Sequence, residues 1–498
     1  MIALRKRAFA GVVLGLLGMG QSGNAVATSP RASAAESPVT YLKRISASNR
    51  VQPPLAAVIA IAPDVLNQTA AALRSDGPLA GLSVLIKDNV ETRDMPTTAG
   101  SLALANNRTG RDAPLVGRLR TAGAVVLGKT NLSEWANFRS SLSSSGWSGV
   151  GGQARNPHAL DRSPCGSSSG SGAAVAAGLA WAAVGTETDG SITCPASVNG
   201  VVGFKPTVGM ISRSGIVPIS HVQDTPGPMT RTVADAAIML DAMAGADATD
   251  PATAAAPSGA RAGLLSGLAD ANLKGVRIGV LVKQVGPLPR VSALFEAAKA
   301  DLVSAGAVLV PIDFTIPEAL GKAEQTALLY EFRIDLDHYL GALPGHSQVR
   351  SLADVIEFDK ARHGQEMRWF EQDLLEQALA ATDATAYIKA RADASRLAGP
   401  EGIDRLLREN NLVALIAPTA GPAWSIDLIN GDHVSDVGAG SLPAVAGYPH
   451  LTVPMGAVEG LPVGLSFIGK AWDDAVILRI GAAYERARHA VLAVAPNR

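Results

Sequence analysis

Residues 163–192 constrain the fold more than any other stretch of this sequence. A loop rich in serine and glycine, 163–172, leads into the apolar run 173–184, and a second glycine–serine loop, 185–192, follows it. A serine- and glycine-rich tract by itself is typical of a flexible linker. Here the apolar run between the loops must be buried, so both loops are held against a core and their hydroxyl and N–H groups are fixed in place. This arrangement favours an enzyme.

The overall composition is that of a folded protein. Of 498 residues, 47% are hydrophobic and 17% are charged, which supplies a large core and argues against disorder. A chain of this length can form two or three domains or one large α/β unit. The formal net charge of −1 offers no strong field for nucleic acid or for an anionic membrane surface. We therefore expect no nucleic-acid partner.

The N-terminus has the pattern of a secretory signal peptide. Arg5-Lys6-Arg7 precedes the apolar run 8–19, and Ala25-Val26-Ala27 supplies a site with small residues for cleavage. The apolar run is shorter than the ~20 residues that a membrane-spanning helix needs. We expect a signal peptide over residues 1–27, with a later cleavage near residue 34 as the alternative, and an exported protein, periplasmic or secreted, without a membrane span. Both the general and the twin-arginine export routes fit the pattern.

Short apolar runs alternate with helical patterns along much of the chain. Residues 83–86 and 124–129 are predicted to be buried strands, and residues 115–122 form a helix between them. Further strands are expected at 274–281 and 412–417. This alternation predicts an α/β fold in which helices cover a sheet.

Lys87 stands directly after the first of these strands, followed by Asp88 and Asn89. A lysine in such a turn ordinarily forms a salt bridge or contacts solvent. At the end of a core strand, however, a buried lysine must be paired or must lose its charge. Lys87 is therefore a candidate for a chemical role.

Two known serine motifs do not fit. Residues 166–170 satisfy the G-x-S-x-G pattern of the α/β-hydrolases, centred on Ser168, but that motif requires a buried strand immediately before it. Residues 155–164 are polar and interrupted by proline instead. The S-x-x-K pattern of penicillin-binding proteins is not met either, because Ser83 stands four residues before Lys87 rather than three.

Histidine and cysteine give weaker signals. His158 and His221 lie nearest to the serine loops, but neither belongs to a recognisable motif, and each is more typical of a loop or core histidine. No H-E-x-x-H motif or zinc-binding spacing is present, so no metal and no cofactor are expected. Cys165 and Cys194 could form one bridge between the loops, and two buried free thiols are at least as compatible with the sequence.

Several separated blocks between residues 40 and 490 resemble the amidase signature family. They are KDN at 87–89, TTAGS at 97–101, GSSSGS at 166–171, GSI at 190–192, GFKPT at 203–207, DTPGPM at 224–229, LPVGL at 461–465 and AYE at 483–485. The commoner pattern of the family has glycine where this chain has Cys165, Ser169 and Asp189. Those three departures resemble the bacterial peptide amidases within the family.

The resemblance implies a Ser–cis-Ser–Lys triad. Ser191 aligns with the nucleophile, Ser167 with the bridging serine and Lys87 with the base, and the two serines stand 24 residues apart, as in the family. It also implies a non-proline cis peptide bond at Ser167. The segment that matches the oxyanion hole offers the backbone N–H groups of Thr188, Asp189, Gly190 and Ser191.

The family also implies the architecture and the activity. We expect a single large domain over residues 38–498, with a mixed sheet covered by helices on both faces. The mostly helical region of about 290–410 is expected to cover the substrate. Trp369-Phe370, within that region, could line an acyl pocket, although core packing is the more common role of such a pair.

The expected activity is serine amidohydrolysis through an acyl-enzyme, with the C-terminal amide of peptides as the substrate and ammonia as the product. A broad aliphatic or aryl amide hydrolase is the first alternative. A glutamine amidotransferase-type subunit and a non-catalytic amide-binding protein are lesser ones, because the former needs cytoplasmic partners and the latter would lack the triad. A small-molecule or peptide amide is the expected partner, and no obligate protein partner is expected.

Overall fold

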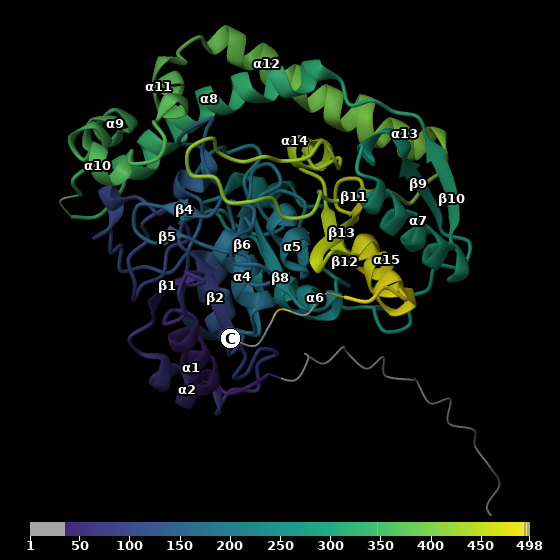
Figure 1. The fold of residues 1–498 in the computed structure, drawn as a ribbon, viewed down its shortest axis with the longest axis horizontal. Helices are drawn as coiled ribbons and strands as arrows, with labels where there is room; N and C mark the ends of the chain where they lie inside the picture. The colour runs from purple at the N-terminus through teal and green to yellow at the C-terminus, as the bar shows by residue number, and fades with distance from the viewer. Residues whose placement is uncertain (1–34, 346, 493–494, 496–498) are drawn as a thin grey trace, which may run out of the picture.

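One sheet of eleven strands organises the described part of the chain (Figure 1). The computed structural model describes residues 35–345, 347–492 and 495. In order across the sheet, the strands are β1 (Val58–Ile61), β3 (Val125–Thr130), β2 (Ser83–Lys87), β6 (Ala182–Glu187), β8 (Thr225–Thr230), β7 (Val202–Lys205), β12 (His450–Val458), β13 (Leu461–Ile468), β11 (Ala414–Pro418), β9 (Arg277–Leu281) and β10 (Val308–Ile312). A separate two-stranded ribbon joins β4 (Trp147–Ser148) to β5 (Gly152–Gln153).

The sheet is mixed, as expected. Strands β3, β2 and β6 are parallel to one another, and so are β11, β9 and β10 at the other end. Between these groups, each strand from β6 through β8, β7, β12 and β13 to β11 runs antiparallel to its neighbour. Since β6 and β7 both run antiparallel to β8, they are parallel to each other. The carboxyl ends of β2, β6 and β7 therefore meet at one edge of the sheet.

Helices cover both faces of the sheet, which confirms the predicted architecture. On one face, α4 (Ser169–Ala176) and α5 (Thr193–Asn199) pack closely, and an added methyl group on Gly203 of β7 would collide with Ala196 of α5. On the opposite face, Gly481 of α15 packs against Leu451 of β12. That face is covered by α6 (Val233–Met243), α7 (Pro289–Ser304) and α15 (Asp474–Ala487).

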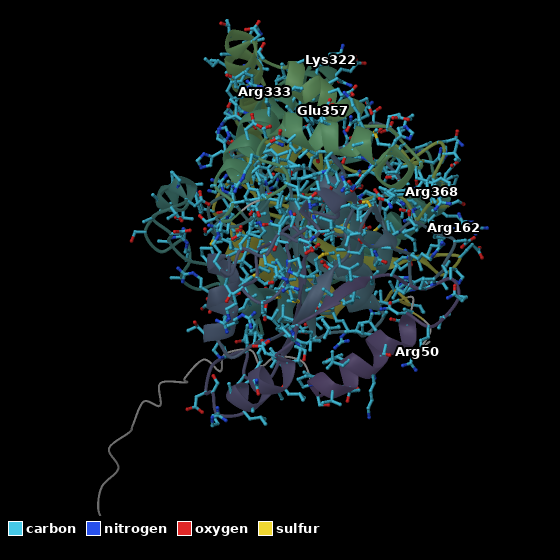
Figure 2. All side chains as sticks on the ribbon, turned by 90° about the vertical axis from the view of Figure 1, so that its left-hand side faces the viewer. Arg50, Arg162, Lys322, Arg333, Glu357 and Arg368 are labelled. Carbon is cyan, nitrogen blue, oxygen red and sulfur yellow. A yellow bond between two sulfur atoms is a disulfide. The ribbon has the colours of Figure 1, made fainter. Side chains whose placement is uncertain are left out.

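A layer of helices lies beyond the sheet and forms the arch at the top of Figure 1. We call this layer the cap. It consists of α8 (Glu318–Gly341), α9 (Leu352–Ala361), α10 (His363–Glu366), α11 (Asp373–Ala380) and α12 (Ala384–Ala398), and it continues into α13 (Asp404–Glu409). The cap has its own apolar cluster around Phe332 and Leu336 of α8. On its outer side, Lys322 and Glu357 are exposed and project to the surface (Figure 2).

The helices and strands expected from the sequence are present with small shifts at their ends. The helix predicted at 115–122 corresponds to α3 (Pro114–Thr121), and it is preceded in the chain by α1 (Pro38–Ser48) and α2 (Val65–Ala72). Residues 290–410 contain mostly helices, with strand β10 between α7 and α8; α14 (Ser441–Ala446) completes the helices. The predicted signal peptide, 1–27, lies outside the described residues. Among the residues that are described, no helix is long and apolar enough to span a bilayer.

Candidate active site

Lys87 ends β2 and is completely buried. Its Nζ lies 2.8 Å from Ser167 Oγ, 2.8 Å from Thr186 Oγ1 and 3.2 Å from the Thr186 carbonyl oxygen. Strand β6 is parallel to β2 and places Thr186 beside the lysine. The structure thus brings together two of the three residues of the implied triad, Lys87 and Ser167.

The surroundings of Lys87 favour its neutral form. Burial lowers its pKa from the ordinary value near 10.5 to about 7, while the negative charges of Asp224 and Glu187 oppose this shift. Desolvation disfavours an ammonium because the interior solvates charge poorly. Near neutral pH, Lys87 is therefore available as a base that receives a proton.

Ser167 is held by an unusual backbone. The Gly166–Ser167 peptide bond is cis, as the family resemblance implies. The carbonyl oxygen of Ser167 accepts a hydrogen bond from Ser133 N–H at 3.1 Å, and the side chain is fully buried. An added methyl group on Gly166 would collide with Ser133 Oγ, so glycine is required there for close packing.

The neighbouring serines of this loop are structural. Ser168 Oγ donates to the Thr186 carbonyl at 3.1 Å and accepts from Thr186 N–H at 3.2 Å. Ser171 Oγ donates to the Val184 carbonyl at 2.9 Å. Both hydroxyls therefore attach α4 to strand β6. This agrees with the interpretation of the G-x-S-x-G pattern as coincidental.

The loop from Thr188 to Ser191 follows β6 directly. Its carbonyl at Ser191 accepts a hydrogen bond from Ser168 N–H at 3.2 Å, which places the two serine loops side by side. In the described part of the chain, the N–H groups of Asp189, Gly190 and Ser191 donate to no protein acceptor. Gly190 has φ +75°, a conformation that glycine adopts without strain.

The hydroxyl groups of Ser191 and Ser167 are not hydrogen bonded to each other within the described residues. Ser191 is 9% exposed, whereas Ser167 is fully buried. The structure therefore brings the predicted nucleophile to the same edge of the sheet as Lys87 and Ser167, and leaves the final contact between the two serine side chains unmade.

Glu187 anchors the backbone after Ser191. Its Oε2 accepts hydrogen bonds from Ile192 N–H at 2.7 Å and from Thr193 N–H at 2.9 Å. Helix α5 begins at Thr193, where this carboxylate satisfies its first N–H groups. Sequence reasoning did not assign Glu187 a role. An acidic residue at the end of an apolar core strand, where a buried charge requires partners, is the signal that could have revealed it.

A second carboxylate supports the start of the loop. Asp224 Oδ1 accepts a hydrogen bond from Thr188 Oγ1 at 2.5 Å, while its Oδ2 accepts from the N–H groups of Ile219 and Ser220 at 2.8 and 3.0 Å. Burial raises the pKa of Asp224 to about 6, although these hydrogen bonds oppose the shift. Asp224 was recognised as part of a family block, but its contact with Thr188 could not be read from sequence.

Asp189 faces the cap. Ser441 Oγ donates to Asp189 Oδ2 at 2.8 Å, and Glu324 of α8 is close enough to share a proton with Asp189. The pKa of Asp189 rises to about 6 because protein surrounds its carboxyl group, even though solvent reaches the side chain. The pKa of Glu324 rises to about 8, chiefly through burial and then through the charge of Asp189. Gln223 Nε2 connects the two layers by donating to Glu324 Oε1 at 2.8 Å.

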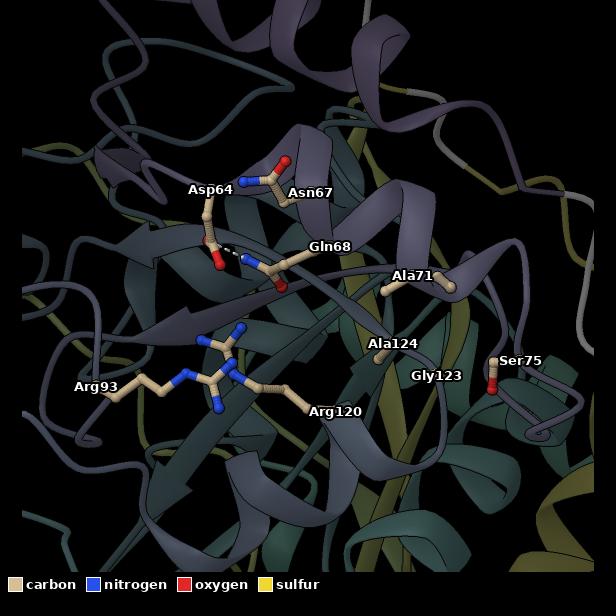
Figure 3. Close-up of a pocket in the computed structure, with 10 residues that line it drawn as sticks. Asp64, Asn67, Gln68, Ala71, Ser75, Arg93, Arg120, Gly123 and Ala124 are labelled. Carbon is tan, nitrogen blue, oxygen red and sulfur yellow. Dashed lines mark hydrogen bonds between the residues drawn. The ribbon is translucent and has the colours of Figure 1, made fainter.

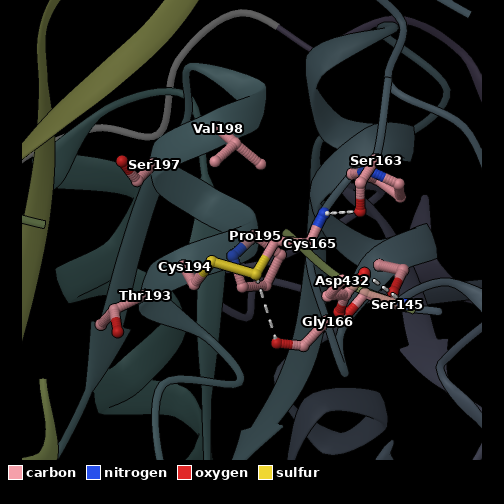
Figure 4. Close-up of a disulfide and its surroundings, with 12 residues drawn as sticks. Ser145, Ser163, Cys165, Gly166, Thr193, Cys194, Pro195, Ser197, Val198 and Asp432 are labelled. Carbon is pink, nitrogen blue, oxygen red and sulfur yellow. Dashed lines mark hydrogen bonds between the residues drawn. A yellow bond between two sulfur atoms is a disulfide. The ribbon is translucent and has the colours of Figure 1, made fainter. Parts of the chain in front are cut away.

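Cys165 and Cys194 form a disulfide, which resolves the two possibilities left open by the sequence (Figure 4). Cys165 stands two residues before Ser167, and Cys194 stands three residues after Ser191. The bridge packs with Val198, Ala423 and Trp424 in a small apolar cluster. It therefore ties the two serine loops together covalently beside the candidate site.

Other candidates from the sequence lie elsewhere. The ring of His158 contacts the Asn199 carbonyl oxygen at 3.0 Å, and His221 pairs with Asp335 at 2.9 Å. Phe370 packs in an edge-to-face arrangement on Trp147, with ring centroids 5.1 Å apart, which is core packing. Across the described ranges, no group of three His, Cys, Asp or Glu residues is arranged to hold a metal ion.

A pocket of about 300 Å³ is separate from this site (Figure 3). It lies between α2 and the segment that leads into β3, and Arg93, Arg120 and Asp64 line it. Arg120 is paired with Asp94 at 2.9 Å. None of the predicted site residues borders this pocket.

Known proteins resemble the chain over almost its whole length. The sequence model of the family described as Amidase matches residues 39–478. The structure of native peptide amidase from Stenotrophomonas maltophilia is 50% identical, with a TM-score of 0.87 over 92% of this chain and 94% of that one.

Two curated relatives have more distant sequences. A probable amidase of Arabidopsis thaliana is 40% identical over 90% of this chain and 85% of its own length. A glutamyl-tRNA(Gln) amidotransferase subunit of Symbiobacterium thermophilum is 36% identical over 91% of this chain and 93% of its own. Together with the match of the family model, these similarities show that the chain belongs to the amidase signature family of amide hydrolases.

Proposed function

We propose that the protein hydrolyses amides through an acyl-enzyme, with Ser191 as the nucleophile, Ser167 as the proton relay and Lys87 as the base. One observation carries this proposal: a fully buried lysine with a pKa of about 7 lies 2.8 Å from Ser167 Oγ. Activation of a serine requires a neighbouring base that is neutral at the working pH, and Lys87 meets that condition.

The steps follow from this arrangement. Neutral Lys87 takes the proton of Ser167 Oγ while Ser167 takes the proton of Ser191 Oγ, and Ser191 Oγ forms a bond to the amide carbon. The N–H groups of Thr188, Asp189, Gly190 and Ser191 stabilise the negative oxygen of the tetrahedral intermediate. As the C–N bond breaks, the proton returns from Lys87 through Ser167 to the leaving nitrogen and ammonia departs. Water then attacks the ester carbon by the same route, and the acid and free Ser191 are released.

The proposed substrate is the C-terminal amide of a peptide. Support comes from the 50% identity to a peptide amidase and from Cys165 and Asp189, which follow the pattern of that branch within the two serine loops. The relationship to amidotransferase subunits at 36% identity favours one alternative, hydrolysis of glutamine for a partner protein. A broader amide hydrolase is the other.

Ammonia release separates these possibilities. A peptide amide, an N-acyl amino-acid amide, an aryl amide and free glutamine are offered to the wild type at equal concentration. We expect kcat/KM to be highest for the peptide amide and to fall to background in Ser191→Ala. Activity on glutamine alone would contradict the peptide amide proposal, and full activity in Ser191→Ala would contradict the assigned nucleophile.

We also propose that the protein is exported and works in the periplasm or outside the cell. The signal-peptide pattern of residues 1–27 supports this location, and so does the Cys165–Cys194 disulfide, because such bonds persist in oxidising compartments. Fractionation of cells that express the full chain tests the proposal. Recovery of the protein only in the cytoplasm, with residues 1–27 retained, would contradict it.

A further inference from the structure

A second buried lysine lies near the candidate site and has no part in the proposed steps of amide hydrolysis. Lys205 is the last residue of β7 and is completely buried. Among the described residues, its Nζ donates one hydrogen bond, to the Pro206 carbonyl oxygen at 3.2 Å. A buried lysine is costly unless charge compensates it, so the acidic groups around Lys205 indicate what it does.

The sheet topology places Lys205 and Glu187 at the same edge. Strands β6 and β7 run parallel with β8 between them, and Glu187 and Lys205 are their last residues. Two strand spacings separate the backbones by about 10 Å, and the register places Lys205 level with Gly185, so the two long side chains face each other diagonally across β8.

Both side chains also point to the same face of the sheet. Added methyl groups on Gly185 and Gly203 would each contact Ile192, the residue that follows the candidate nucleophile. Side chains alternate along a strand, so Glu187 and Lys205, two residues further on, share that face. Lys87, at the end of β2, completes a row of positive, negative and positive groups along this edge.

The contacts of Glu187 explain why its charge matters. Oε2 holds the N–H groups of Ile192 and Thr193, while the buried Oε1 has no hydrogen-bond partner among the described residues. Lys205 and Glu187 form no direct ion pair in this part of the chain. In an interior of low dielectric, however, opposite charges attract over more than contact distance.

We propose that Lys205 is a positioning residue that acts through Glu187: its buried ammonium compensates the negative charge of the Glu187 side chain, and that side chain fixes the backbone after Ser191. The inference rests on the proposed function, because it assigns Lys205 a role in shaping the loop that would bind the oxyanion. It requires that losing the charge of Lys205 and losing the charge of Glu187 have the same consequence.

The other groups that face Lys205 do not replace Glu187 in this role. The two oxygens of Asp474, at the start of α15, already accept the N–H and the hydroxyl of Thr207 at 2.9 and 2.6 Å. His450 of β12 has its pKa lowered to about 3 by burial and by the charge of Lys205, so it is neutral. Asp189 belongs to the loop itself and is held by Ser441.

The charge of Lys205, and with it the proposed effect on Glu187, is lost as the pH rises. Burial lowers the pKa of Lys205 to about 8, against the charges of Glu187, Asp474 and Asp189. Lys205 is therefore charged below pH 8 and loses its charge as the pH rises through 8, so the support for Glu187 is lost on the alkaline side. Glu324, with a pKa of about 8, also titrates there, and substitution of Lys205 separates the two groups.

The test is a double-mutant cycle read over pH 6–10. Wild type, Lys205→Met, Glu187→Gln and the double variant are compared in kcat for ammonia release from an uncharged peptide amide. We expect Lys205→Met to lower kcat at pH 7.5 by roughly tenfold to a hundredfold, less than the loss of a direct oxyanion donor. The double variant is expected to be no slower than Glu187→Gln. If the double variant loses kcat by the product of the factors lost in the two single variants, the proposal is overturned, because the residues would then act independently.

Lys205→Arg provides the readout that a purely structural lysine would not change. Arginine stays charged throughout this range, so the part of the alkaline fall in kcat that Lys205 contributes is expected to move from about pH 8 to above pH 10. An unmoved alkaline fall in a folded Lys205→Arg variant would overturn the proposal. If arginine does not fit the buried site and the variant fails to fold, Lys205→Met provides the test instead. Because methionine does not titrate, the part of the alkaline fall in kcat that Lys205 causes must be absent from that variant.

Lys129 supplies the matched control. It is another fully buried lysine at the same edge of the sheet, paired with Asp88 at 3.0 Å. Lys129→Met is expected to lower the melting temperature without moving the alkaline fall in kcat. The rate at which a fluorophosphonate modifies Ser191 is measured for every variant as well. If the wild type releases no ammonia from peptide amides, the proposed function fails, and the fluorophosphonate rates still decide whether Lys205 and Glu187 act together.

Discussion

The disulfide between Cys165 and Cys194 joins the loop of Ser167 to the loop of Ser191. Its two cysteines are 29 residues apart in sequence, and their Cα atoms are 6.1 Å apart. The same two loops touch through the hydrogen bond from Ser168 N–H to the Ser191 carbonyl. The covalent bond and the hydrogen bond thus restrain the pair of serines proposed to share a proton.

Replacement of both cysteines by alanine is expected to lower the free energy of unfolding by about 3 kcal/mol. A loop of this length leaves the unfolded chain more conformational freedom once the bridge is removed. Chemical denaturation of the double variant measures the change, and wild type treated with a reductant is the control that should match it. Equal unfolding midpoints for the oxidised wild type and the double variant would contradict the expectation.

The activity should rise with pH through about 7 on the acid side. Lys87 acts as a base only when neutral, and its pKa is lowered to about 7, so protonation below that pH stops the reaction. Lys87→Met is expected to lower kcat by roughly 10²–10⁴-fold, the usual contribution of a general base. A kcat profile over pH 5–9 checks both points. An acid-side fall centred near pH 5 would point to a carboxylate instead.

Removal of Lys87 should also not destabilise the fold. Its pKa in the folded state lies below that in the unfolded chain, so burying it costs stability at every pH below about 10. We therefore expect Lys87→Met to melt at or above the wild-type temperature at pH 7. A large drop in melting temperature would show that the lost hydrogen bonds outweigh the burial cost.

Ser167 and Ser168 should respond differently to substitution, although they are neighbours. Ser167→Ala breaks the contact between Lys87 and the proposed relay and should lower kcat by at least about 10²-fold. Ser168→Ala removes two hydrogen bonds to Thr186 and should cost roughly 1–3 kcal/mol of stability, with kcat within about tenfold of wild type. The opposite ranking of the two kcat values would make Ser168 the functional residue.

Glu324 should make stability depend on pH. Its pKa is raised to about 8 in the folded protein, so its stabilising contribution is complete below the unfolded value near 4.3 and is lost as the pH rises through 8. Glu324→Gln removes the free-energy cost of ionising this buried carboxyl group at high pH. We expect it to stabilise the protein by roughly 1–3 kcal/mol more at pH 9 than at pH 5. Glu318→Gln, an exposed position on the same helix, should show no such difference.

Arg139 should be critical for the attachment of the cap. It is fully buried and lies 3.3 Å from Glu134, while its guanidinium carbon lies 4.2 Å from the ring centroid of Phe370 and 4.9 Å from that of Trp147. Arg139→Met leaves buried carboxylates unpaired and should cost about 3–5 kcal/mol. Arg139→Lys should not restore stability, because a lysine lacks the planar guanidinium that donates to the carbonyl oxygens of Glu366 and Phe370 at once. Limited proteolysis that cleaves the cap first would locate the damage.

The sequence predicted the local elements well because their signals are local. The apolar runs at 83–86 and 124–129 are strands β2 and β3, and the serine loops follow the expected order around buried segments. Lys87 is unusual from its sequence position alone, because it stands where a core strand ends. The role of Ser167, in contrast, came from family resemblance, because the sequence alone does not distinguish the six serine hydroxyl groups in these loops.

What the sequence by itself determined was the fold class and a small set of residues for the chemistry. Only the tertiary structure decided which of them meet: Glu324 reaches Asp189 across 135 positions of sequence, and Glu187 supports α5 from the preceding strand. It also decided the pairing of Cys165 with Cys194 and the burial of Lys87 and Lys205. The physical reason is that hydrophobic pattern and backbone preference act over a few residues. Contacts between charged groups, and the pKa values that follow from them, depend on strands and helices brought together from distant parts of the chain.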